Sequence, residues 1–110
     1  MADTPLHLKT IVEIASLIES KSVSPVEVTE AALMRIEEHD PHYKSYATVM
    51  AGHARESART AEQAIADGNY LGPLHGVPIA VKDLCFTTGV ATMGATKSLM
   101  DHVPNFDGTV

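Results

Sequence analysis

Hydrophobic residues recur at helical spacing in a first segment near the start of the chain. Its apolar stripe consists of Ile11, Ile14, Ala15 and Ile18. Thr10 precedes this stripe, and Glu13 follows Thr10 by three positions. This spacing predicts a capping box, in which each side chain accepts a hydrogen bond from the backbone N–H of the other residue. We therefore expect a helix that begins after Thr10 and ends near Ser20–Ser22.

A second helical pattern begins at Ser24, where the start signal is stronger. Ser24 suits the N-cap, Pro25 suits the first helical position, and Glu27 completes another capping box. We expect this helix to close at Asp40, because Pro41 disfavours the α conformation in the residue before it. The two segments together predict a helical hairpin.

A third and longer helix is expected from about Ala51 to Asp67. Its apolar stripe is built mainly of small side chains, which allow close approach to a sheet or to another helix: Ala54, Ala58, Ala61 and Ile65. Gly68 and Asn69 both tolerate the left-handed conformation and suit its C-terminal cap. Before this helix, Ser45–Val49 is rich in β-prone residues and predicts a short strand.

The segment Gly72–Asp83 joins turn residues to a short apolar run, Val77–Val81. A run of this length predicts a strand buried on both faces, with Pro78 near its start or on a sheet edge. The run ends at Lys82. A lysine in this position is either solvated, with its stem on apolar surface, or shielded from water and able to act as a general base. The local pattern leaves both interpretations open.

Composition and charge exclude several classes of protein. The chain has 110 residues, which is one domain at most, with 45% hydrophobic and 20% charged residues. Its formal net charge of −6 and its lack of a basic run disfavour a nucleic-acid surface. No apolar run approaches the ~18 residues that would span a membrane. The single cysteine, Cys85, permits no internal disulfide and is consistent with a reducing compartment, which we take to be the cytoplasm.

Cofactor and metal sites are not indicated. We treat the six histidines as ordinary polar residues: His39 and His42 are three positions apart, but at a helix end, whereas a metal site needs three or four convergent ligands. No glycine-rich phosphate loop is present. Cys85 is expected to be a small core residue. If the strand continues, alternation turns Asp83 away from Lys82, so we expect Asp83 to fix nearby backbone or groups around the site rather than to pair with the lysine.

The segment Leu74–Asp83 resembles the lysine-bearing segment of the amidase signature family, and Asp107–Val110 resembles a helix-start motif of the same family. The resemblance implies a Ser–cis-Ser–Lys triad in which Lys82 is the general base, without metal or organic cofactor. It also implies an α/β fold, with N-terminal helices packed on the first strands of a mixed central sheet. Residues 1–110 would then be the N-terminal part of a single amidase domain, an incomplete amidase-signature fold that stops before both catalytic serines.

The function implied for the parent protein is hydrolysis of the C–N bond of a small-molecule carboxamide through an acyl-serine intermediate. We expect a cytoplasmic enzyme, a homodimer at full length, and no activity from this chain alone. One alternative is the A subunit of a glutamyl-tRNA amidotransferase, which belongs to the same family and needs partner subunits. An alternative from another class is a small non-catalytic α/β binding module that is complete at 110 residues.

Overall fold

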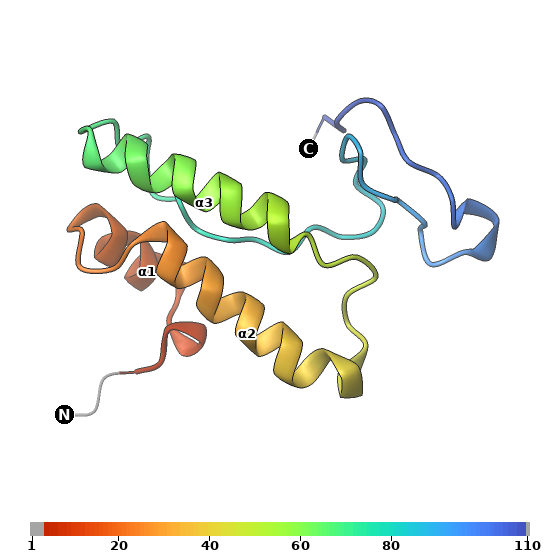
Figure 1. Cartoon of the computed structure of the whole chain (residues 1–110), viewed down its shortest axis with the longest axis horizontal. Coiled ribbons are helices and arrows are strands. Elements are labelled where there is room, and N and C mark those ends of the chain that lie inside the picture. The colour runs from red at the N-terminus through yellow and green to blue at the C-terminus, as the bar shows by residue number, and fades with distance from the viewer. Residues whose placement is uncertain (1–3, 110) are drawn as a thin grey trace. The chain divides into compact units, whose positions relative to one another are not determined.

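The computed structural model describes residues 4–109 and divides them into two units. The larger unit comprises the described residues up to Ser45 together with Met50–Pro78, and the smaller unit comprises Tyr46–Val49 and the described residues from Ile79 onward. Figure 1 shows the helical elements in chain order, which are η1 (Leu6–Leu8), α1 (Ile11–Glu19), α2 (Pro25–Tyr43), α3 (Ala51–Ala66) and η2 (Lys97–Leu99). Between residues 4 and 109, every helix is too short or too polar to cross a membrane.

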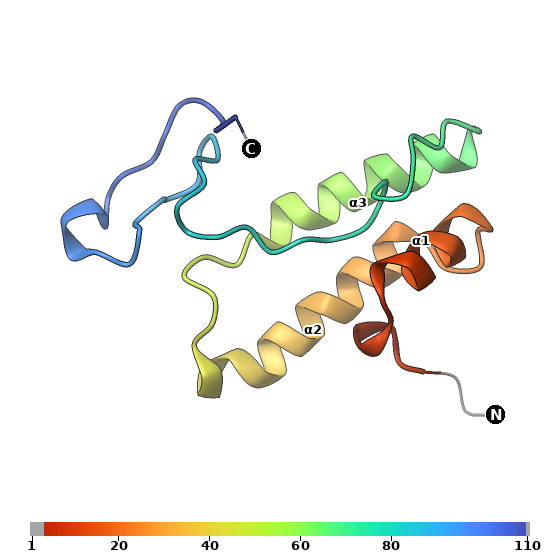
Figure 2. The ribbon, with the colours of Figure 1, turned by 180° about the vertical axis from the view of Figure 1, so that it is seen from behind.

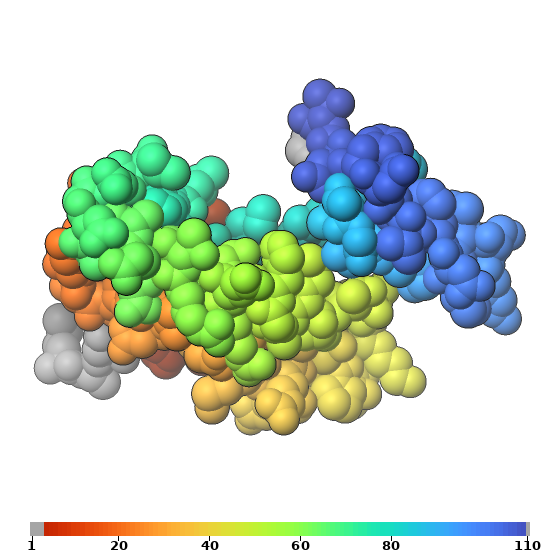
Figure 3. Space-filling model, turned by 45° about the horizontal axis from the view of Figure 1, so that its top comes forward, coloured from red at the N-terminus to blue at the C-terminus, as the bar shows by residue number. Residues whose placement is uncertain are grey.

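The core of the larger unit lies where its three α-helices meet. Helices α2 and α3 pack along one another and lie side by side from both directions of view (Figures 1 and 2). In the space-filling view the green atoms of α3 lie directly on the orange atoms of α2 (Figure 3). The buried side chains are contributed by all three helices: Ile14, Ile18, Val28 and Ile65. Removal of these aliphatic side chains from water is the main force that holds the three helices together.

The two predicted capping boxes are confirmed. The Glu13 N–H donates to Thr10 Oγ1 at 3.2 Å, and the Thr10 N–H donates to Glu13 Oε2 at 2.7 Å. The same exchange joins Ser24 and Glu27 at the start of α2, at 3.1 and 2.7 Å. Each box satisfies backbone N–H donors that the start of a helix otherwise leaves without a partner. The two boxes therefore determine where α1 and α2 begin.

The predicted third helix and its cap are also confirmed. Helix α3 ends at Ala66, and Gly68 takes a φ of +88°. The Gly68 N–H donates to the Ile65 carbonyl at 3.1 Å, and the Asn69 N–H donates to the Ala64 carbonyl at 2.8 Å. This pair of bonds is a Schellman motif, which requires a left-handed residue where the sequence has glycine.

The prediction that the second helix closes at Asp40 is wrong, because α2 continues through Pro41 to Tyr43. Asp40 itself holds the chain beyond the proline. Its carbonyl accepts the Lys44 N–H at 2.6 Å, and its carboxylate Oδ1 accepts the Ser45 N–H at 2.7 Å. These two bonds stabilise the last turn and offset the α-helical backbone bond that a proline cannot make.

The expected α/β fold with a mixed central sheet is not what residues 4–109 form. This part of the chain is helical, and its β-type pairing is one isolated bridge between Thr87 and Val90. The strands predicted at Ser45–Val49 and Val77–Val81 are wrong: no backbone hydrogen bond within the described range reaches Ile79, Ala80 or Val81. Ile79 is 73% exposed, so the expected burial on both faces is wrong too. An apolar run becomes a strand only where a second strand pairs with it.

A charged pair ties α2 to α3 and leads to a prediction about acid stability. Arg55 Nε and Nη2 donate to the two carboxylate oxygens of Glu30 at 2.6 and 3.2 Å. These hydrogen bonds lower the pKa of the Glu30 carboxyl from its ordinary value of 4.5. A carboxyl with a lowered pKa in the folded state stabilises the protein above its unfolded pKa and loses that contribution as the pH falls through its folded value.

We therefore expect Glu30→Gln to destabilise the full-length protein slightly at neutral pH and to have progressively less effect below pH 4.5, the ordinary value for this carboxyl. The loss at neutral pH should be small, a few degrees in Tm at most, because both side chains are partly exposed. Thermal unfolding of both proteins across this pH range measures the difference. Glu62→Gln, at an exposed position of α3, is the matched control. An effect of Glu30→Gln that stays constant down to pH values well below 4.5 would contradict this assignment.

Candidate active site

Lys82 lies in the smaller unit, on a turn rather than on a strand. The Cys85 N–H donates to the Lys82 carbonyl at 3.0 Å, so the chain reverses across Asp83 and Leu84. The Lys82 side chain is exposed, and within residues 4–109 no hydrogen bond or ion pair joins its ammonium to another residue. A lysine acts as a general base only where water is kept from its amine. Nothing within the described part of this chain supplies that shield.

Asp83 fixes the loop that follows Lys82. Its Oδ1 accepts the Met93 N–H at 2.9 Å, and its carbonyl accepts the Gly94 N–H at 2.8 Å. The two bonds close the loop from Asp83 to Gly94 at its base. Because the segment turns instead of continuing as a strand, the alternation from which the direction of Asp83 was predicted does not apply. Cys85 is half-buried.

We expect Asp83→Ala to open the base of this loop. The variant loses one of the two bonds that close it, so hydrogen exchange at the Met93 amide should accelerate by about three- to tenfold, the usual range for one partly exposed hydrogen bond. Exchange at amides of α3 in the larger unit should not change. The control is Asp101→Ala, since Asp101 is an exposed aspartate of the same unit. Unchanged exchange at Met93 in Asp83→Ala would show that the side-chain bond does not hold the loop.

A second carboxylate anchors the other end of this unit. Asp107 Oδ1 accepts the Thr88 N–H at 2.9 Å, and this bond lowers the pKa of the Asp107 carboxyl from its ordinary value of 3.8. The neighbouring Gly108 N–H donates to the Phe86 carbonyl at 2.8 Å. Asp107 and Gly108, the first residues of the segment that resembles a helix-start motif, are therefore bonded to the loop after Lys82. Local sequence could not show this contact, because its partners are far apart in the chain.

Aromatic side chains cluster in this unit, although Phe106 itself is 57% exposed. The Phe86 ring lies 5.4 Å from Phe106 and 5.2 Å from His102, measured between centroids. The Thr92 N–H donates to the His102 carbonyl at 2.9 Å, and Thr92 is buried. His102 thus has a structural position in this cluster. Among residues 4–109, no three histidine, cysteine or carboxylate side chains lie together as metal ligands would.

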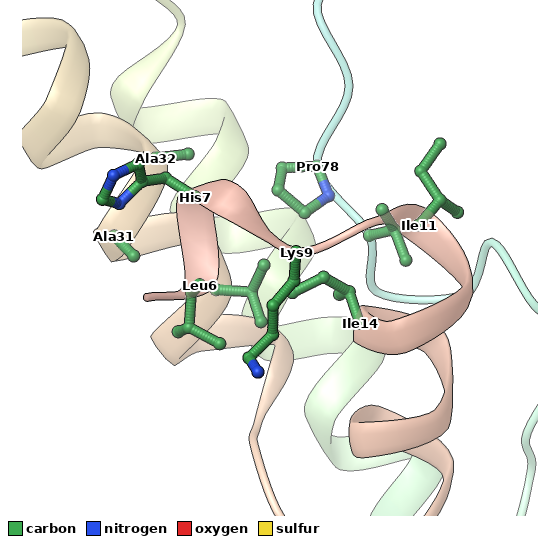
Figure 4. A pocket seen from close by; sticks show the side chains of 10 residues that line it. Leu6, His7, Lys9, Ile11, Ile14, Ala31, Ala32 and Pro78 are labelled. Carbon is green, nitrogen blue, oxygen red and sulfur yellow. The ribbon is translucent and has the colours of Figure 1, made fainter. Parts of the chain in front are cut away.

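An apolar pocket of about 160 Å³ lies in the larger unit (Figure 4). Lys82 is not part of it. The pocket is bounded by η1, the first turn of α1, the N-terminal half of α2 and the segment that follows α3, with the lining residues including Leu6, His7, Ile14, Ala31, Val77 and Pro78. Its walls are mostly aliphatic, and the polar side chains that line it are those of His7 and Lys9.

Comparison with known proteins shows the family of the chain. The sequence model described as Amidase matches residues 27–110, which include Lys82 and Asp83. The chain is 48% identical over 100 residues to AmiD of Mycobacterium bovis, which carries an amidase name. Two further relatives are A subunits of glutamyl-tRNA(Gln) amidotransferase. The chain is 41% identical over 101 residues to the one from Cutibacterium acnes and 42% identical over 105 residues to the one from Moorella thermoacetica.

These alignments cover most of this chain and a small part of each relative. They span 91%, 92% and 96% of the chain, against 21%, 20% and 22% of the respective relatives. The chain therefore spans about one fifth of the length of these relatives. The family match covers more than half of the chain, and the resemblance that the sequence suggested is confirmed: the chain belongs to the Amidase family.

Proposed function

We propose that this chain contributes the general base of an amidase, with Lys82 as that base and the nucleophilic serine supplied by the rest of the protein. The observation that carries the proposal is that Lys82 lies in the segment Leu74–Asp83, which resembles the lysine-bearing segment of the amidase signature family and lies inside the matched range. The reaction is hydrolysis of a small-molecule carboxamide at its C–N bond.

The proposed mechanism gives Lys82 two proton transfers. A serine hydroxyl is a weak nucleophile until a base takes its proton. The neutral amine of Lys82 receives that proton through the bridging cis-serine while the serine oxygen bonds to the carbonyl carbon. When the C–N bond breaks, the ammonium returns a proton to the departing amine. Water then releases the acid from the acyl-serine.

The exposure of Lys82 in the described residues sets a condition on this proposal. The ammonium becomes a useful base only after water is removed, since burial disfavours the charged form. The remainder of the protein must therefore cover the turn at Lys82. Asp83 would contribute by fixing the loop that begins beside the lysine, through its bonds to Met93 and Gly94.

The test is an assay of ammonia release by the full-length protein on a series of aliphatic and aromatic carboxamides. Added hydroxylamine should divert product to the hydroxamate, because an acyl-serine can be captured by a second nucleophile. The isolated 110-residue chain should be inactive. Amide turnover by the isolated chain that is abolished by Lys82→Met would overturn the division of the site between this chain and the rest of the protein.

A second candidate is the A subunit of an amidotransferase, which is favoured by the 41–42% identity to proteins of that name. The two candidates differ in substrate and in their need for partners. An amidase should hydrolyse simple carboxamides by itself. A component of an amidotransferase should act on glutamine, with activity that depends on added partner subunits. The enzyme names of these relatives favour either candidate over a small non-catalytic module.

A further inference from the structure

The turn that follows α3 is closed by a histidine side chain. The Leu71 N–H donates to Nδ1 of His75 at 3.1 Å. Two backbone bonds accompany it: the His75 N–H donates to the Gly72 carbonyl at 3.0 Å, and the Val77 N–H donates to the Leu74 carbonyl at 3.2 Å. We call this segment, residues 71–77, the His75 turn. The imidazole supplies the bond that joins the start of the turn to its middle.

The direction of this bond fixes the state of the imidazole. Because a backbone N–H donates to Nδ1, that nitrogen must present a lone pair, and the proton of the neutral ring must be on Nε2. An imidazolium carries a proton on both nitrogens and accepts no hydrogen bond. We propose that His75 is a pH-sensitive latch: its neutral form closes the His75 turn, and protonation releases the Leu71 N–H.

The surroundings of His75 provide little to offset that release. The imidazole stacks on the Tyr70 ring, with centroids 6.1 Å apart and planes 25° apart. The neighbouring Gly76 lies against Pro25 and Ile18 at the corner between α1 and α2. Of these neighbours only Tyr70 has a titratable group, and none carries a charge. Within residues 4–109 no ion pair involves the imidazole of His75.

Release of the latch would act on the wall of the apolar pocket. Val77 is the last residue of the His75 turn, and Val77 and Pro78 both line that pocket. Histidine is the side chain that ordinarily changes charge between about pH 5 and pH 8. The pocket wall would therefore be held firmly while the imidazole is neutral and loosened once it is protonated. This inference does not depend on whether Lys82 is a catalytic base.

The first test is hydrogen exchange at the Leu71 amide of the full-length protein, measured as a protection factor so that the intrinsic pH dependence of exchange is removed. Between about pH 8 and about pH 5 we expect protection to fall about three- to tenfold in the wild type, which corresponds to one partly exposed hydrogen bond. Amides inside α3 should keep their protection. Constant protection at Leu71 across this range would overturn the proposal.

Two substitutions separate the acceptor from the ring. His75→Asn places Oδ1 where Nδ1 lies and cannot be protonated in this range, so Leu71 should stay protected at both pH values. His75→Phe keeps a ring to stack on Tyr70 and removes the acceptor, so protection should be low at both. If pH dependence persists in either variant, another group is responsible and the proposal fails.

A measurement on the unmodified protein decides the matter if either variant fails to fold. The nitrogen chemical shifts of His75 distinguish the two neutral tautomers. At about pH 8 the latch requires a proton on Nε2 and none on Nδ1. A proton on Nδ1 at that pH would exclude the Leu71 bond and overturn the inference.

Discussion

Replacing Lys82 with methionine should lower kcat/KM for amide hydrolysis by the full-length protein by about 10²–10⁴-fold, the usual contribution of a positioned general base. Methionine keeps an unbranched side chain of similar length and has no group that can accept a proton. The packing of residues 4–109 should be unaffected, because the Lys82 side chain makes no hydrogen bond or ion pair with any of them. Initial rates of ammonia release and a thermal unfolding curve, measured on the same preparation, check both expectations.

Two controls define what the loss at Lys82 means. Lys97→Met removes an exposed lysine of η2 in the same unit, and its activity should equal that of the wild type. Lys82→Arg keeps the positive charge, but an arginine does not deprotonate in proteins, so it should be as inactive as the methionine variant. If Lys82→Arg retained activity, the residue would be acting as a fixed charge and not as a base.

The elements that sequence predicted correctly depend on signals a few residues apart. The capping boxes at Thr10 and Ser24 each join residues three positions apart, and the cap of α3 depends on Gly68 directly beyond its end. Such bonds form whenever the local backbone is helical, so the residue types alone predict them. The extension of α2 beyond Pro41 shows the limit of this reasoning, because two bonds to Asp40 offset the missing N–H.

The errors concern structure that depends on distant partners. The strand expected at Val77–Val81 needs a second strand at its side, and no segment of residues 4–109 provides one. The Arg55–Glu30 pair joins two helices across a long stretch of sequence, and no local pattern indicates it. Strand pairing and contacts between helices depend on the tertiary structure. Hydrophobic periodicity reports only local structure and does not predict such contacts.

The sequence identified Lys82 as the candidate base, but it did not predict the backbone conformation or the exposure of the segment around it. The segment Leu74–Asp83 points to Lys82 by its resemblance to the family, and the family match covers that segment. The predicted burial of the segment was wrong, and the bond from Asp83 to Met93 could not be foreseen, since it depends on the path of the loop between them. The residue types indicate that Lys82 can act as a base. The exclusion of water that a lysine base requires must come from the part of the protein that covers the turn at Lys82.

Replacing Gly76 with alanine should be the most destabilising single-methyl change in the larger unit. A Cβ at this position would lie 2.6 Å from Cγ and 3.0 Å from Cβ of Pro25, and Gly76 has a φ of +85°. The left-handed backbone costs an alanine about 1–2 kcal/mol, and overpacking typically costs about 1–3 kcal/mol. We therefore expect the free energy of unfolding to fall by roughly 2–5 kcal/mol. Urea-induced unfolding of the full-length protein measures this loss.

Gly68→Ala separates the two causes of that loss. Gly68 has a nearly identical φ of +88°, but a Cβ there meets no atom within 4 Å. Its substitution should cost only the backbone term, about 1–2 kcal/mol. The difference between the two variants then measures the contact between the His75 turn and Pro25 at the corner of α1 and α2. Equal losses would show that this contact is loose enough to yield to a methyl group, and the His75 turn would then be held by its hydrogen bonds rather than by packing.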